Sequence, residues 1–166
     1  MFHEIGIDTL KFNPFTMIGE EWMLISAGNH KKFNTMTAGW GSVGKVWGQR
    51  CVSVYLRPQR YTREFVDDSG LFTLSFFLPE YRRALELCGE KSGRDTDKVA
   101  MAGLTPYFVE DTVSFEQAAL ILICRKLYRM PFFEDCFVNP EIVREFYPEK
   151  DFHIMYTGAV LKALAK

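Results

Sequence analysis

The sequence carries almost no excess charge of either sign. Its 166 residues include 20 Lys and Arg against 21 Asp and Glu, which gives a net charge of −1. Proteins that bind DNA or RNA depend on a positive surface that neutralises phosphates, so nucleic acid is not an expected partner. The one notable basic cluster is local, at Arg57, Arg60 and Arg63. A cluster of this size fits a small anionic ligand better than a polyanion.

Cysteine is also scarce, and its spacing is not that of a metal site. The four cysteines are Cys51, Cys88, Cys124 and Cys136. None forms a C-x-x-C pair and no histidine lies at zinc-ligand spacing from them, so no metal is expected. We predict reduced thiols that mainly fill the core of a cytoplasmic protein.

Long hydrophobic runs are missing as well. The longest, from Ala118 to Cys124, is too short to cross a bilayer. The N-terminal residues M-F-H-E-I-G contain no basic start followed by an apolar run, so no signal peptide is visible. We therefore expect no association with a membrane.

What the sequence does contain is typical of one soluble domain over residues 1–166. Apolar residues make up 48% and charged residues 25%, and this length can bury a core without disulfides or metals. Aromatic residues reach 15%, which is more than a minimal core needs. Ring-lined surfaces for a flat ligand are one use for the excess, and a dimer interface is another.

Strand patterns outnumber helix patterns. Residues 51–57 alternate, with Val52, Val54 and Leu56 on one face, and residues 71–77 alternate in the same way. Residues 114–129 fit either a buried helix or a long central strand, and the dense apolar centre followed by Pro131 favours a strand. The predicted strands are residues 22–26, 33–40, 51–57, 71–77, 114–129 and 152–164.

The predicted helices are short and lie between strands, at residues 61–68, 80–88, 95–102 and 140–146. Thr62 is the expected N-cap of the first, Ser92 or Asp95 of the third, and Asn139 of the fourth. The second is expected to stop at Gly89. A doubly wound parallel sheet needs regular strand–helix alternation, which is missing. The order of elements favours a mainly β protein, a β-barrel with short inserted helices.

Residues 39–44 match the dinucleotide-binding pattern G-x-G-x-x-G, but their context does not. In a dinucleotide fold a helix begins within the motif, whereas here residues 45–48 lead directly into the strand at Cys51. A protein kinase is excluded by the short chain and the missing H-R-D loop. The remaining interpretation is a glycine-rich turn between strands. Trp40 and Trp47 beside it would suit a flat ligand.

Two polar loops have the composition of a phosphate site. Residues 57–62 combine arginines with the Thr62 hydroxyl before a predicted helix, which is what a phosphate with about two negative charges needs. A solvated loop with a helix cap explains the same residues. Residues 88–98 add a second set of donors: Lys91, Ser92, Arg94 and Lys98. Two such loops in one barrel favour a bound anion.

Five motifs in this order resemble the flavin reductase-like family, and most closely its flavoredoxin group. They cover nearly the whole chain, and the N-T-M-T and K-S-G-R-D segments within them are the most specific. The motifs are residues 34–41, 57–62, 72–76, 88–98 and 153–158.

The resemblance implies an FMN-binding split barrel of the Greek-key type, usually a homodimer with the flavin near the subunit interface. Residues at the ring would be Asn34, Thr35, Met36, Thr37 and Trp40. Residues at the phosphate end would be Arg60, Thr62 and Lys98, with Arg57, Lys91 and Ser92 nearby. Ser75, from the third motif, is also assigned to cofactor binding. Ala159 departs from the pattern, because a glutamate often follows that glycine in the family, and any role of that acid is in doubt here.

The resemblance also implies the reaction. The leading hypothesis is an NAD(P)H:flavin oxidoreductase that transfers hydride from NADH or NADPH to FMN. The reduced flavin then either passes electrons on to a redox partner protein or leaves for a partner oxygenase. The alternatives are a flavoredoxin-like electron carrier with tightly bound FMN and no nicotinamide site, and a binding module that has lost the cofactor. No catalytic residue is assigned. His153 is either a proton donor or a packed histidine hydrogen-bonded to backbone, and Cys88 is either a redox thiol or inert.

Overall fold

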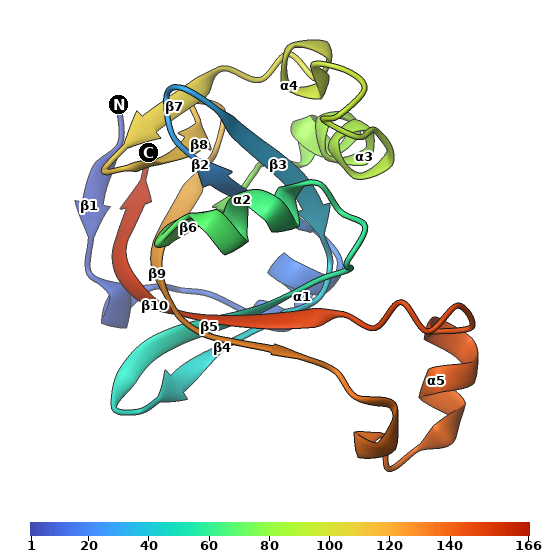
Figure 1. The fold of residues 1–166 in the computed structure, drawn as a ribbon. Coiled ribbons are helices and arrows are strands. Elements are labelled where there is room, and N and C mark those ends of the chain that lie inside the picture. Colours follow the sequence, from blue (N-terminus) through green and yellow to red (C-terminus); the bar gives the residue numbers. More distant parts are fainter.

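The computed structural model describes residues 1–166, and most of them lie in antiparallel strands. Eight strands form one sheet that curls into a barrel (Figure 1). Its order is β3 (Phe33–Ala38), β2 (Met23–Gly28), β6 (Leu71–Phe76), β9 (Leu120–Pro131), β10 (Ile154–Ala165), β5 (Gln49–Leu56) and β4 (Gly41–Val46), with β1 (His3–Ile5) paired to β10. β7 (Pro106–Val109) and β8 (Thr112–Phe115) form a separate hairpin. The predicted mainly β barrel is confirmed.

The strand order leaves the barrel open along one seam. β3 and β4 follow each other in the chain, yet they are the two ends of the sheet and are not hydrogen-bonded to each other. Only Gly39 and Trp40 connect them. Several other neighbours in the sheet, such as β2 with β6 and β5 with β10, are far apart in sequence, as in a Greek key. The seam is where the barrel is split.

Most predicted strands are confirmed to within three residues at their ends. Val52, Val54 and Leu56 are at most 1% exposed, so the alternation in β5 correctly identified the buried face. Residues 114–129 are extended rather than helical, but a turn at residues 116–119 divides them into β8 and β9.

The glycine motif is a turn between strands only in part: Gly39 and Trp40 connect β3 to β4 as predicted, but residues 41–44 lie in β4, where the prediction of a turn is wrong. Residues 41–46 form β4, and the turn of the β4–β5 hairpin falls at Trp47 and Gly48. Both turn residues have positive φ, 50° and 73°, as a two-residue hairpin turn requires. No helix begins in the motif, which agrees with the rejection of a dinucleotide fold.

The helices are α1 (Pro14–Gly19), α2 (Thr62–Asp68), α3 (Arg82–Glu90), α4 (Lys98–Met101) and α5 (Pro140–Phe146), with single 3₁₀ turns at Ile7–Thr9, Pro79–Tyr81 and Glu134–Cys136. α5 is confirmed together with its cap, since the Asn139 side chain accepts from the Glu141 N–H at 3.0 Å. α1 was not predicted, and Gly89 lies inside α3 rather than after it. None of the helices is both long enough and apolar enough to cross a membrane.

Two predicted helix caps are wrong. Tyr61 occupies the N-cap position of α2, and the Thr62 hydroxyl instead accepts a hydrogen bond from the Asn34 amide at 3.0 Å. α4 begins only at Lys98, because the Asp97 carboxylate accepts from the Ala100 N–H and caps the helix there. The first difference depends on the tertiary structure, which brings Asn34 to Thr62, whereas the second follows from a local contact between residues 97 and 100.

Apolar side chains form two cores, one on each face of the sheet. The first fills the barrel and includes Phe72, Leu74 and Tyr156, and the second lies between the sheet, α3 and the β7–β8 hairpin. β6 is buried on both faces. Its two polar side chains are hydrogen-bonded to β8. The Thr73 hydroxyl donates to Val113 O at 2.6 Å, and the Ser75 hydroxyl lies 2.8 Å from Ser114 Oγ.

A substitution at Gly158 in β10 tests how tightly the barrel is packed. A Cβ at this position would lie 2.7 Å from the Phe72 ring and 3.2 Å from Arg125 O. Phe72 is 1% exposed and has no room to retreat, so Gly158→Ala is expected to lower the free energy of unfolding by about 2–3 kcal/mol. Urea denaturation measures it. Gly44→Ala is the matched control, because nothing lies within 4 Å of its Cβ; equal stability of the two variants would contradict the packing.

Candidate functional site

An open cleft of about 510 Å³ lies at the seam of the barrel. It is lined by the consecutive residues 36–40, by Tyr55 and Arg57 at the end of β5, by Arg60, by one side of α3, and by His153. Because consecutive residues of β3 line it, the cleft runs along the edge of that strand rather than over one face. This edge has no strand partner, so its backbone N–H and C=O groups are free of the sheet.

Two tryptophans form aromatic walls of the cleft. Trp40 is 43% exposed and contacts the rings of Phe146, at a centroid distance of 5.4 Å, and His153, at 5.0 Å. Trp22 has an unusual φ of 70°. Its ring lies between the Arg82 guanidinium, 3.2 Å from the ring centroid, and Gly39, where a Cβ would approach Trp22 Cδ1 to 3.0 Å. Both rings are thus held in place before any ligand arrives.

Two cations lie at the polar end of the cleft without a carboxylate partner. Arg60 donates to Gly89 O at 2.8 Å, and Lys98 donates to Cys88 O and Lys91 O at 3.1 Å each. Lys98 is only 3% exposed, and burial lowers its pKa to about 8, with Arg60 adding to the shift. Burial also lowers the pKa of Arg60. A buried cation without an anion is costly, so this arrangement suits an anionic ligand.

The other arginine of the first polar loop has partners already. Arg57 pairs with Asp151 at 2.6 Å and donates to Phe146 O at 2.8 Å. It therefore ties the end of β5 to the segment between β9 and β10. Its charge is balanced within the protein, unlike that of Arg60.

The comparisons with known proteins agree with this geometry. The family model for the flavin reductase like domain matches residues 18–163. The chain belongs to the flavin reductase-like domain family. No curated protein matches the sequence.

Solved structures of similar fold include three that bear on the family. The FMN-binding domain of a flavin reductase-like enzyme from Shewanella baltica superposes with a TM-score of 0.72 at 17% identity, over 99% of this chain and 77% of that one. Flavoredoxin from Methanosarcina acetivorans gives 0.70 at 20%, over 88% and 68%. A flavin reductase with a split barrel domain from Shewanella frigidimarina gives 0.65 at 14%, over 95% and 75%. The predicted split barrel is thereby confirmed.

Five of the residues predicted for the ligand of this flavin reductase-like chain line the cleft: Met36, Thr37, Trp40, Arg57 and Arg60. Thr37 donates its hydroxyl to Leu85 O, which fixes α3 against β3.

Four more predicted residues gather just beyond the Arg60 end. Asn34 and Thr62 are hydrogen-bonded to each other, Lys91 is exposed, and the Ser92 hydroxyl accepts from the Arg94 N–H at 3.2 Å. Together with Lys98, they place both polar loops at one end of the cleft.

Two predicted residues turn their side chains away from the cleft. The Thr35 hydroxyl is buried and lies 2.8 Å from Ser26 Oγ and 3.2 Å from Ile25 O. The Ser75 hydroxyl is occupied by Ser114 on the α3 side of the sheet. Strand alternation explains the first case, because neighbours in β3 face opposite sides of the sheet.

His153 lines the cleft, and its hydrogen bond is not the expected one to backbone. Its Nδ1 lies 2.7 Å from the Tyr147 hydroxyl. Burial, aided by the charge of Arg57, lowers the pKa of His153 to about 4, so the imidazole is neutral at neutral pH. His153 is thus a neutral hydrogen-bonding group of the cleft wall and not an imidazolium proton donor.

The remaining sequence candidates lie outside the cleft. Cys88 is fully buried, and burial raises its pKa to about 11, so it stays a thiol at neutral pH. Ala159 is buried in β10, where it is paired with Cys51 on one side and Arg125 on the other. No group of three or more metal-ligating side chains is present.

Sequence reasoning missed several residues of the cleft. Trp22, Tyr55 and Leu85 contribute its apolar walls, and Glu86 and Glu90 on α3 form an acidic rim. Trp22 and Tyr55 lie in predicted strands. Leu85 and Glu86 lie in a predicted helix and Glu90 lies in the second polar loop, so each had an ordinary local explanation. Only their approach to β3 in space reveals the role.

Proposed function

We propose that residues 1–166 form a single FMN-binding domain that acts as an NAD(P)H:flavin oxidoreductase, transferring hydride from NADH or NADPH to FMN. The observation that carries the proposal is a pair of cations at one end of an aromatic cleft, neither with a carboxylate partner: half-buried Arg60 lies in the cleft lining, and buried Lys98 lies just beyond it. An FMN phosphate carries about two negative charges near neutral pH and would supply the missing anion.

The residues present fit the two ends of FMN. Arg60 and Lys98 would hold the phosphate, with Thr62, Lys91 and Ser92 beside them. Met36, Thr37, Trp40 and Trp22 would bound the ring, and the free backbone edge of β3 offers hydrogen-bonding groups to a heterocycle. Asn34, predicted at the ring, would also hold Thr62 at the phosphate end through their hydrogen bond. Thr35 would contact the ligand through its main chain only, and Ser75 would act indirectly by supporting β6. When bound, FMN supplies the hydride and electron transfer.

The protein's own part would be to orient and shield. The tryptophans are held by neighbouring groups, so little order would be lost on binding a planar ring. His153 is neutral and would add a hydrogen-bonding group without a charge. No side chain is assigned as a general acid or base, because the hydride step needs none.

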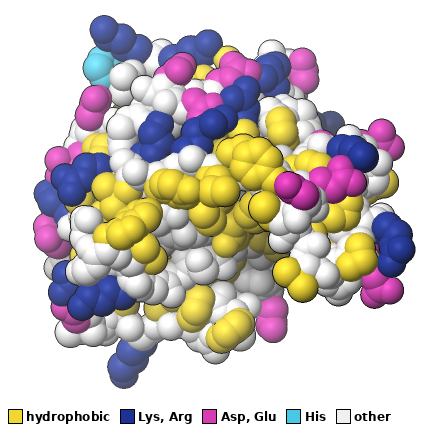
Figure 2. All heavy atoms as spheres, turned by 60° about the horizontal axis from the view of Figure 1, so that its bottom comes forward, with side chains coloured by type: hydrophobic (Ala, Val, Ile, Leu, Met, Phe, Trp, Pro, Cys, Tyr) yellow, Lys and Arg dark blue, Asp and Glu magenta, His cyan; other side chains and the backbone are white.

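A homodimer is part of the proposal. Figure 2 shows hydrophobic side chains gathered across the face that forms the bottom of Figure 1, where β4 and β5 lie. Exposed apolar residues there include Trp47 at 60%, Tyr128 at 38% and Met130 at 36%. Apolar patches of this kind are typical of subunit contacts. Light scattering is expected to give twice the chain mass of 19.2 kDa, and a monomer would contradict it.

The experiment that tests the function is a visible spectrum of the protein after mixing with FMN and desalting, followed by anaerobic NADH or NADPH. A retained flavin band that bleaches within seconds is the expected result. A retained band that bleaches only with dithionite would favour the second candidate, a flavoredoxin-like electron carrier that serves a redox partner protein in the cytoplasm. The similarity to flavoredoxin from Methanosarcina acetivorans favours that candidate. A chain that retains no flavin would contradict tight binding of FMN.

A further inference from the structure

The two polar loops face each other and are joined by arginines that cross in opposite directions. Arg60, from the first loop, reaches Gly89 O of the second at 2.8 Å. Arg94, from the second loop, reaches Gln59 O of the first at 3.1 Å. Arg94 also pairs with Glu64 of α2, and its guanidinium lies 4.5 Å from the centroid of the Tyr61 ring. The Arg94 side chain therefore joins the second loop to the first loop and to α2 through three contacts.

The second loop packs closely against β3 at Gly93, the residue before Arg94. A Cβ on Gly93 would lie 2.2 Å from Asn34 Oδ1, so residue 93 packs directly on that amide. The same amide donates to the Thr62 hydroxyl at 3.0 Å. The loop that carries Lys91 and Ser92 is thus held at Gly93 and Arg94 on one side and by Lys98, through Lys91 O, on the other.

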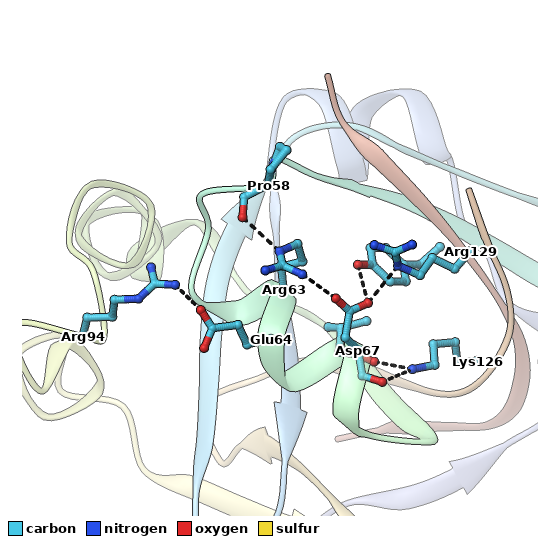
Figure 3. Close-up of polar contacts among 9 residues, drawn as sticks. Pro58, Arg63, Glu64, Asp67, Arg94, Lys126 and Arg129 are labelled. Atoms are coloured by element: carbon cyan, nitrogen blue, oxygen red, sulfur yellow. Dashed lines mark hydrogen bonds and ion pairs between the residues drawn. The ribbon is translucent and has the colours of Figure 1, made fainter. Parts of the chain in front are cut away.

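The element that Arg94 grips is itself fixed. Figure 3 shows α2 tied to β9 at its C-terminal end, opposite the Glu64–Arg94 pair. Asp67 pairs with Arg63 at 2.6 Å and with Arg129 at 3.0 Å, and Lys126 donates to the carbonyls of Val66 and Asp67 at 2.6 Å each. Contact with Arg94 consequently sets where the second loop stands.

We propose that Arg94 is a positioning residue for the phosphate end of the flavin. Its guanidinium is already engaged by Gln59, Tyr61 and Glu64, so it does not bind the phosphate itself. It holds Lys91 and Ser92 beside Arg60 and Lys98. This inference rests on the proposed binding of FMN. It assigns Arg94 a selective effect, on flavins that carry a phosphate and not on the ring.

Arginine is required for this role because one planar fork serves a carbonyl, a carboxylate and a ring at once. Lysine offers a single ammonium on a flexible stem and cannot make the three contacts together. Arg94→Lys is therefore expected to behave almost like Arg94→Ala. Glu64→Gln removes the negative charge from one of the three partners but keeps an amide oxygen as acceptor, so it is expected to have a smaller effect.

The test compares the dissociation constants of FMN and riboflavin, measured by quenching of flavin fluorescence, in the wild type, Arg94→Ala, Arg94→Lys and Glu64→Gln. Riboflavin has the same ring and no phosphate. For FMN we expect an increase of about tenfold in Arg94→Ala and about threefold in Glu64→Gln, with riboflavin changed less than twofold. Arg144→Ala is the matched control, because this exposed arginine pairs with Glu141 on α5, outside the cleft lining.

Each outcome decides between the inference and the function beneath it. If the wild type prefers FMN and Arg94→Ala keeps the same preference, the inference is wrong. If Arg94→Ala weakens both flavins equally, the arginine supports the fold in general, and the inference is again overturned. If the wild type itself does not prefer FMN, the proposed phosphate site is wrong. Circular dichroism checks folding, and Glu64→Gln carries the test if Arg94→Ala does not fold.

Discussion

Replacing both Arg60 and Lys98 with alanine is expected to raise the dissociation constant of FMN about a thousandfold. Hydrogen bonds from charged groups contribute about 2 kcal/mol each, which is about thirtyfold per residue. Neither cation has a carboxylate partner in the protein, so the loss of positive charge should fall on the anionic ligand. Each single variant should lose about thirtyfold. Fluorescence titration with FMN measures the effect.

The controls for the double variant separate ligand binding from folding. Arg60→Met with Lys98→Met keeps the buried alkyl volume and should lose the same affinity. Riboflavin should bind the wild type and both double variants almost equally. Lys162→Ala removes an exposed lysine that pairs with Glu110 and should change nothing. Unchanged FMN affinity in the double variants would refute the phosphate assignment.

The second large effect is a loss of FMN affinity at alkaline pH. Burial lowers the pKa of Lys98 to about 8 in the flavin-free protein, so above pH 8 the side chain loses its proton unless an anion holds it. A bound phosphate favours the protonated form and raises this pKa. Affinity should thus fall as pH rises from 7 to 10, and the total loss equals the contribution of the ammonium, about thirtyfold.

The other ionisable groups near Lys98 are not expected to change charge over most of the range from pH 7 to 10. The pKa of Cys88 is raised to about 11 by burial, so the thiol stays uncharged through most of it, and Arg60 keeps its charge as guanidinium groups do in proteins. On the acid side the second phosphate proton of FMN, with a pKa near 6, should lower affinity below that pH. The expected profile is a plateau between about pH 6 and 8.

Two comparisons test the origin of the alkaline limb. Riboflavin should show neither limb, because it has no phosphate. Lys98→Arg should lose the alkaline limb, because arginine does not titrate in this range. An alkaline limb that persists in Lys98→Arg would mean that another group titrates, and the role given to Lys98 would be wrong.

The sequence by itself determined most of the strands but not β1, β4 and β7, and it also determined one helix cap and the chemistry of the loops. Alternation in β5 identified its buried face because a strand places neighbouring side chains on opposite sides. Asn139 with Pro140 identified the start of α5, since a cap depends on residues two or three apart. β4 was not predicted, because it is an end strand with Val43 and Val46 exposed, so no buried face imposes an alternating pattern on its sequence. The resemblance in five motifs led to the right family.

Only the tertiary structure decided which polar residues meet. Arg60 and Lys98 are 38 positions apart, and they become neighbours because both donate to consecutive carbonyls, at Gly89 and Cys88. Thr35 matched the family motif as well as Met36 did, yet its hydroxyl is hydrogen-bonded to the Ser26 hydroxyl inside the protein. Trp22 and Arg94 act through partners on distant segments. A local pattern specifies which groups a segment offers, whereas long-range packing decides whether a donor is spent inside the protein or left for a ligand.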